Sequence, residues 1–207
     1  MPLDYATLGG VKRRLDISDS NDDDVLLDII ADVNQDIEDI TGRAIGPITL
    51  TNELIDGYDA LEGGRCILYP KGIREVTTLE VATMTGGDFN TVPSSDLFLR
   101  PTQHLRQPDW PAFEIWMTDV PSAGNTVTTF APGFANVRLT GTGGWAAIPS
   151  TVTSAAEVTA KRTFLSDRGG FSEADDDLGV RSFRALWRGM DIRTLERFQW
   201  KAVEIID

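Results

Sequence analysis

The residues with the clearest chemical potential are ten carboxylates that lie between Leu15 and Arg43 with no Lys or Arg among them. Carboxylates this close together can hold a divalent cation, act as a paired acid and base, or repel other anions. Their spacing decides between these roles. The ten residues are Asp16, Asp19, Asp22, Asp23, Asp24, Asp28, Asp32, Asp36, Glu38 and Asp39.

A calcium site fails on this spacing. The run that begins Asp16-x-Ser18-x-Ser20 starts like an EF-hand loop, but its sixth position is Asn21 rather than Gly and its twelfth is Leu27 rather than Glu. A second acidic run, Asp175-Asp176-Asp177, could hold a divalent ion, although consecutive acids in a Gly-flanked loop are usually solvated.

Other motifs for catalysis or cofactor binding are equally incomplete. Cys66 and His104 are the only cysteine and histidine, so neither a disulfide nor a structural zinc site is expected. The segment Gly141–Trp145 lacks the Lys-Ser/Thr of a phosphate-binding loop and predicts a turn. We therefore assign no catalytic, cofactor-binding or metal-binding residue.

The acidic segment is instead predicted to be one long amphipathic helix. Its aliphatic residues recur at steps of three and four, which places them on one face. Ser20 or Asn21 could cap its start, Asp22 to Asp24 suit the positive end of the helix dipole, and Gly42 ends it. The aliphatic residues are Val25, Leu26, Ile29, Ile30, Val33, Ile37 and Ile40.

A row of four aspartates, Asp24, Asp28, Asp32 and Asp36, lies one turn apart along this helix. Like charges at this spacing cost a few tenths of a kcal/mol each, so the row does not serve helix stability. A solvated helix face is the simple explanation, and a surface that repels an anion is the alternative.

The composition excludes several classes of protein. The chain has 207 residues, is 41% hydrophobic and carries a formal net charge of −13. It lacks a run of eighteen apolar residues and a basic-then-apolar leader, so neither a membrane span nor export is expected, and an intracellular origin is inferred. Tight binding to nucleic acid needs clustered Lys and Arg, which this acidic chain does not offer overall.

The pattern of elements predicts an α+β protein. A short helix over residues 4–15 precedes the long helix, and a helix with a stripe of small residues opens at Pro149 to Thr151 and ends near Ser166. Between them, Gly and Pro separate short β-branched and aromatic segments. The clearest strands are Ile48–Ile55, Cys66–Tyr69, Val76–Thr83, Phe113–Thr118 and Val137–Thr140.

The domain organisation follows from this order. Residues 1–44 and 149–166 are expected to form a small helical bundle, interrupted by a large β-rich insertion over residues 45–148. Residues 167–207 are a linker followed by an extended C-terminal docking arm, which mixes Arg with aromatic residues as protein interfaces do. The residues predicted to dock a partner are Arg181, Arg184, Trp187, Arg188, Arg197 and Trp200.

Two segments resemble signatures of the head-tail connector family of tailed bacteriophages, also called adaptor or head-completion proteins. The first is "LGGVKRRLDISDSNDDDVLLDIIADVNQDIEDITGR", Leu8 to Arg43. The second is "NVRLTGTGGWAAIPSTVTSAAEVTAKRTF", Asn136 to Phe164. Together the two segments cover about a third of the chain. The chain differs from short members of the family in its β-rich insertion.

The resemblance implies a structural virion protein and no enzyme. It implies a ring of twelve copies at the neck of the virion, assembled in the host cytoplasm, that joins the portal protein to tail or tail-completion (stopper or terminator) proteins. Double-stranded DNA would pass through the ring without specific binding. The acidic row Asp24, Asp28, Asp32 and Asp36 would then face the channel, since a negative wall keeps phosphates from adhering.

Two other functions stay open on the sequence alone. One is an acidic metal-dependent hydrolase or nuclease that uses paired carboxylates. The other is a different virion adaptor, such as a tail-completion or baseplate protein, that binds its partner through the β-rich insertion.

Overall fold

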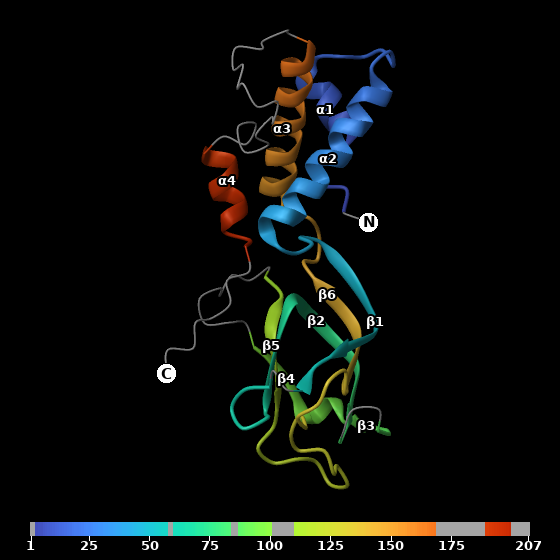
Figure 1. Ribbon diagram of the computed structural model, residues 1–207, viewed down its shortest axis with the longest axis vertical. Coiled ribbons are helices and arrows are strands. Elements are labelled where there is room, and N and C mark those ends of the chain that lie inside the picture. The colour runs from blue at the N-terminus through green and yellow to red at the C-terminus, as the bar shows by residue number, and fades with distance from the viewer. Residues whose placement is uncertain (1–2, 58–59, 84–86, 101–109, 169–188, 200–207) are drawn as a thin grey trace. The chain divides into compact units, whose positions relative to one another are not determined.

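The computed structural model describes residues 3–57, 60–83, 87–100, 110–168 and 189–199 (Figure 1). It divides the chain into two compact units. The helical unit comprises Met1–Ile45 and Ile148–Asp207, and the β unit comprises Gly46–Ala147. The described residues form helices in the first and an antiparallel sheet in the second, so the predicted α+β class is confirmed.

Helix α2, Asp23–Thr41, is the long acidic helix that the sequence predicts. Its buried seam consists of Leu26, Ile29, Ile30, Val33 and Ile37, all at most 7% exposed. The helix ends at Gly42 in the left-handed conformation, as expected. Val25 is instead half exposed. The predicted cap is wrong, since Asp22 occupies the N-cap position; it makes no side-chain capping bond, and its carboxylate pairs with Arg168.

Helix α1, Leu8–Leu15, is shorter than the predicted helix over residues 4–15. Thr7 caps it, since the Thr7 hydroxyl accepts a hydrogen bond from the Gly10 N–H. Residues before Thr7 are held on α2 instead. The Asn34 side-chain oxygen accepts hydrogen bonds from the backbone N–H groups of Tyr5 and Ala6, each at 3.1 Å.

Tyr5 extends this N-terminal strap toward the end of α2. Its hydroxyl donates to Glu38 Oε1 at 3.1 Å and accepts from the Ile45 N–H at 2.8 Å. Burial raises the pKa of Tyr5 above its ordinary value, and the hydroxyl stays protonated. The strap therefore ties the chain start to both ends of the segment Asn34–Ile45.

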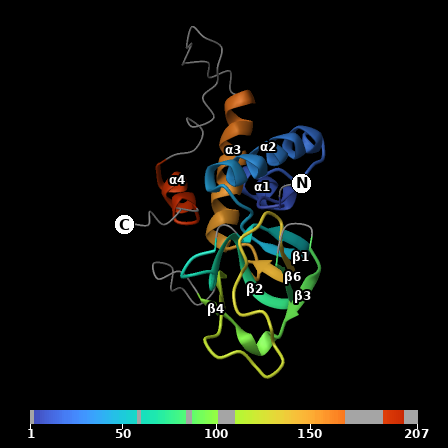
Figure 2. The same cartoon turned by 60° about the horizontal axis from the view of Figure 1, so that its bottom comes forward.

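Helix α3, Ser150–Arg168, packs against α1 and α2 (Figure 2). The predicted stripe is buried at Val152, Ala155, Ala156 and Thr159, and Thr163 is half buried. A side chain at Gly10 would meet Glu157, because a Cβ atom there would lie 1.8 Å from Glu157 Oε1. Gly10, which weakens helix propensity, is what lets α1 approach α3.

Helix α4, Gly189–Glu196, lies within the segment predicted as an extended arm. It contacts α2 and α3, and Leu195 is fully buried. Just after it, the Phe198 carbonyl accepts a hydrogen bond at 2.8 Å from Nε of Arg43. Burial lowers the pKa of the Arg43 guanidinium to about 10, which leaves it charged at neutral pH.

The described residues of the β unit form a six-stranded antiparallel sheet in the order β1-β6-β2-β5-β4, with β3 paired to β2. Strand β2 joins two segments that the sequence predicted as separate strands, Cys66–Tyr69 and Val76–Thr83, and it ends at Ala82. The register of its pairing with β5 shifts between Leu68 and Ile73. The bounds are β1 Pro47–Ile55, β2 Cys66–Ala82, β3 Phe89–Val92, β4 Leu97–Arg100, β5 Ala112–Met117 and β6 Val137–Gly144.

The predicted turn at Gly141–Trp145 is wrong, because Gly141 to Gly144 continue strand β6. The glycines serve close packing between strands: a Cβ on Gly141 would lie 2.1 Å from the Glu75 carbonyl oxygen of β2. The next residue, Trp145, is 2% exposed. The Gly-rich run thus forms the end of an inner strand of the sheet rather than a loop.

The β core forms on one face of the sheet. The side chains of β5 alternate, since Phe113, Ile115 and Met117 are at most 1% exposed while Glu114 and Trp116 between them are half buried. Ile115 and Met117 join a core that includes Ile67, Leu79 and Leu139.

The strap on Asn34 gives the first prediction. Asn34→Ala leaves two buried N–H groups without an acceptor, at a cost of about 1–3 kcal/mol each. We expect the variant to lower the free energy of unfolding by about 2–6 kcal/mol in urea denaturation. Gln35→Ala is the matched control on the exposed face of the same helix, and we expect it to stay within about 0.5 kcal/mol of the native chain. Equal effects of the two variants would contradict the role of Asn34.

Candidate functional site

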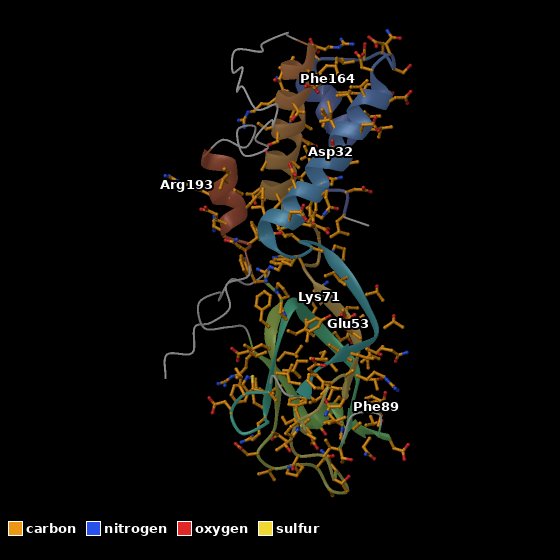
Figure 3. All side chains as sticks on the ribbon, in the orientation of Figure 1. Asp32, Glu53, Lys71, Phe89, Phe164 and Arg193 are labelled. Carbon is orange, nitrogen blue, oxygen red and sulfur yellow. The ribbon has the colours of Figure 1, made fainter. Side chains whose placement is uncertain are left out.

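Helix α2 carries an unbalanced acidic surface on the side away from its buried seam. Asp24, Asp28 and Asp32 are exposed, and none of them makes a hydrogen bond or ion pair with another described residue. We call these three residues the acidic stripe. Figure 3 labels Asp32 on α2. Two exposed aliphatic side chains flank the stripe, Val25 at 50% and Leu27 at 49% exposure.

Asp36, the fourth member of the predicted row, departs from the stripe. A step of four residues turns an α-helix by about 40° beyond a full circle, so the row has rotated by about 120° between Asp24 and Asp36. Asp36 is accordingly half buried. That the row faces a channel stays a prediction.

The remaining acids at the start of α2 have partners within the helical unit. Asp23 pairs with Lys12 at 2.6 Å, and Asp22 pairs with Arg168. Each pair joins α2 to another helix, α1 or α3. These acids therefore stabilise the bundle, whereas the stripe does not.

A basic surface formed by Arg13, Arg14 and Lys161 lies on α1 and α3, and we call it the basic face. Arg14 Nε donates to Glu157 Oε2 at 2.8 Å, and Lys161 Nζ donates to the Arg14 carbonyl at 2.7 Å. Arg13 is exposed and makes no hydrogen bond or ion pair with the part of the chain that the structure describes. One turn beyond Lys161 lies Leu165, which is 49% exposed.

Only one of the predicted docking residues in the C-terminal segment can be placed. Arg197 is exposed just after α4, and so is Arg193 on the helix itself (Figure 3). Phe198 is 7% exposed and packs on its own unit. The other predicted residues, Arg181, Arg184, Trp187, Arg188 and Trp200, lie outside the described residues.

The β unit presents a long ordered loop, residues 118–136 between β5 and β6, which the sequence analysis did not single out. Loops of this length without secondary structure are uncommon in compact domains and often functional. The Asp96 carboxylate holds its first part, accepting hydrogen bonds from the Ser122 N–H and hydroxyl at 3.0 Å and from the Asn125 amide at 2.6 Å.

The second part of this loop is held by Asn136. Its side chain accepts a hydrogen bond from the Gly57 N–H at 2.8 Å and donates to the Ala131 carbonyl at 2.7 Å. The loop nevertheless exposes two apolar side chains, Val120 at 81% and Phe134 at 63%. The Gly, Pro and Ser residues of this segment predict a loop, but only the tertiary contacts of Asp96 and Asn136 reveal that it is fixed.

Two tryptophans of the β unit, Trp110 and Trp116, occupy different environments. Trp110 packs edge-on against Trp145 and Phe113, with ring centroids 5.5 and 6.5 Å apart. Trp116 stacks on the exposed Phe98 at 6.0 Å, and the Arg100 guanidinium lies 5.0 Å from its ring centroid. Trp110 therefore belongs to the packing of the unit, and Trp116 to its surface.

The described residues offer little for catalysis or metal binding. They contain no cluster of three or more His, Cys, Asp or Glu side chains that could hold a metal ion. Cys66 is buried, and burial raises the pKa of its thiol to about 12. His104 and Asp175 to Asp177 lie outside the described residues. No described helix is long and apolar enough to cross a membrane.

Among solved structures, the chain is similar to a chain from the neck of an empty gene transfer agent (GTA) particle, computed with C6 symmetry. The two share 15% sequence identity with a TM-score of 0.50, over 95% of this chain and 90% of that one. A chain from the neck of the native GTA particle, computed with C12 symmetry, is 18% identical with a TM-score of 0.44, over 86% of this chain and 84% of that one. No protein-family model matches the chain, and neither does any curated protein.

The first of these likenesses shows a shared fold across nearly the whole chain, including the β unit. The expected resemblance to neck proteins is confirmed at the level of the fold.

Asp96 gives the second prediction. Burial raises the pKa of this carboxyl, but the hydrogen bonds from Ser122, Asn125 and Ser95 outweigh burial and leave the pKa below its ordinary value. A lowered pKa adds stability above the unfolded-state pKa of about 3.9, and this stability is lost as the pH falls through the folded-state value.

We therefore expect Asp96→Asn to destabilise the β unit by a constant amount between about pH 7 and pH 5, and by less below about pH 4. Urea denaturation across this range measures the difference from the native chain. Asp88→Asn, which changes an exposed carboxylate of the same unit, is the control and should show no such effect. A difference that does not change with pH would contradict the assigned role of Asp96.

Proposed function

We propose that the chain is a structural protein of the neck of a phage-like particle, where copies of it form a ring that joins the portal to the tail and extends the DNA channel. The observation that carries this proposal is the fold shared with a GTA neck chain over 95% of the present chain. The two sequence segments that resemble head-tail connectors, Leu8–Arg43 and Asn136–Phe164, support it independently.

The proposed function requires copies of the chain to bind one another in a ring. The matched neck was computed with C6 symmetry, and six copies or a multiple of six, such as twelve, agree with such an axis. A closed ring needs two different, complementary surfaces on each copy. The acidic stripe and the basic face are two such surfaces within one unit.

The charge of the chain suits a channel through which DNA slides. Twelve copies at a net charge of −13 carry −156 formal charges, and the screening length at physiological salt is about 8 Å. Phosphates close to such a wall are repelled rather than bound. In this proposal the duplex passes without specific contacts.

The proposed partners are the portal protein on one side of the ring and tail or tail-completion proteins, a stopper or terminator, on the other. The protein acts in the virion neck after assembly in the host cytoplasm. The exposed Val120 and Phe134 of the fixed loop and the Arg-rich C-terminal segment are surfaces suited to such partners.

An enzymatic role is not part of the proposal. The described residues hold no metal-binding cluster, and the paired carboxylates of a hydrolase have no counterpart in the acidic stripe, which lies on an open helix face. A different virion adaptor remains the nearest alternative. Binding to the portal distinguishes the two functions, because the proposed connector binds the portal and the alternative adaptor does not.

The third prediction concerns assembly. Negative-stain electron microscopy of the purified full-length chain, alone and mixed with isolated portals, is expected to show closed rings or rings joined to portals. A chain that stays monomeric under both conditions would contradict the proposed function. Rings that form but never join a portal would favour the alternative adaptor.

The fourth prediction concerns DNA. We expect no measurable binding of duplex DNA at physiological salt, even at about 100 μM protein, since nonspecific DNA-binding proteins reach Kd values of about 10⁻⁴–10⁻⁶ M there. Fluorescence anisotropy measures this. The same samples with added Mg²⁺ or Mn²⁺ should leave the DNA intact, and cleavage of the DNA would favour the nuclease alternative.

A further inference from the structure

The acidic stripe and the basic face lie on different helices of the helical unit, the stripe on α2 and the basic face on α1 and α3. The stripe projects from α2 away from the buried seam, and α1 and α3 pack on that seam. On α3, Lys161 and Leu165 are on the side away from the buried Val152 and Thr159. Among the described residues, no hydrogen bond or ion pair joins the two charged surfaces within one chain, so each is available to a neighbouring copy.

Ion pairs within the unit leave these surfaces unbalanced. Lys12 and Arg168 pair with Asp23 and Asp22 across helices, and Arg14 of the basic face pairs with Glu157. Asp24, Asp28 and Asp32 keep their charges without a described partner, and so does Arg13. Complementary charges on two separate surfaces of a molecule favour a head-to-tail contact between copies, because a twofold contact of either surface with its own copy would place like charges together.

Apolar side chains accompany both surfaces. Val25 and Leu27 flank the stripe, and Leu165 lies beside Lys161 on the basic face; all three are 49–50% exposed. Both surfaces therefore combine charge with exposed aliphatic area. Such a combination suits an interface in which apolar contact supplies affinity and charge selects the partner and its orientation.

We infer that the acidic stripe of one copy docks on the basic face of the next copy, and that this contact, repeated around the axis, builds the ring. This inference rests on the proposed function and names the two surfaces it uses. It gives the stripe a role different from the channel-facing one predicted from the sequence, because a helix face covered by a neighbour does not line a channel.

Two charge reversals test the contact. Asp28→Lys makes the stripe less acidic and Arg13→Glu makes the basic face less basic, and both sites are exposed, so the fold should be kept. We expect each variant alone to need at least about tenfold more protein to form rings, the equivalent of about 1.4 kcal/mol. Mass photometry of the full-length chain measures the fraction in rings.

A mixture of the two variants is the decisive sample. In an alternating ring, the introduced Lys on one variant meets the introduced Glu on the other, and the unchanged Asp28 meets the unchanged Arg13, so both contacts are attractive. We expect an equimolar mixture, and likewise the double variant Arg13→Glu/Asp28→Lys, to form rings at nearly the native concentration. A contact that does not pair these two surfaces predicts no recovery.

Matched controls apply the same charge changes to the β unit. Asp88→Lys and Arg74→Glu alter exposed residues of that unit and should leave ring formation unchanged. The inferred contact would be overturned if the single variants formed rings at the same protein concentration as the native chain. It would also be overturned if the mixture did not regain ring formation. Wild-type rings in those experiments would leave the proposed function standing, whereas wild-type protein that forms no ring, with or without portal, would overturn the function itself.

Discussion

The buried seam of α2 is the interaction on which the helical unit depends, because it holds together a helix whose exposed charges repel one another. Each like-charged pair one turn apart costs a few tenths of a kcal/mol. Burial of an aliphatic side chain contributes about 1.5–3 kcal/mol, and the seam supplies five of them, from Leu26 to Ile37. The seam therefore leaves the outer face of α2 free to carry charge for another purpose.

Sequence periodicity predicted the helices and strands correctly where one side of the element is buried. The seam of α2, its end at Gly42, the small-residue face of α3 and the alternation of β5 all follow from local patterns that repeat at the helical or strand period. Local patterns failed where a distant neighbour decides the conformation. Gly141 suits a turn by composition, and the approach of the Glu75 backbone makes it a strand residue.

The candidate surfaces, too, follow partly from local sequence and partly from contacts between distant residues. Composition alone located the acidic helix, but the split of the predicted row depends on helical rotation: Asp36 turns toward the buried side while Asp24 to Asp32 stay exposed. The basic face unites Arg13 with Lys161, which are far apart in the sequence, so it needed the packing of α1 on α3 to appear. The fixing of the loop by Asp96 and Asn136 likewise depends on partners that no local motif links.

The bond between Arg43 and the Phe198 carbonyl joins residues 155 positions apart. It clamps the chain beyond α4 to the end of α2, in a buried setting where a charged donor holds its acceptor firmly. A pull on the chain after Phe198 is thus transmitted to α2 through this clamp before it can peel α4 away.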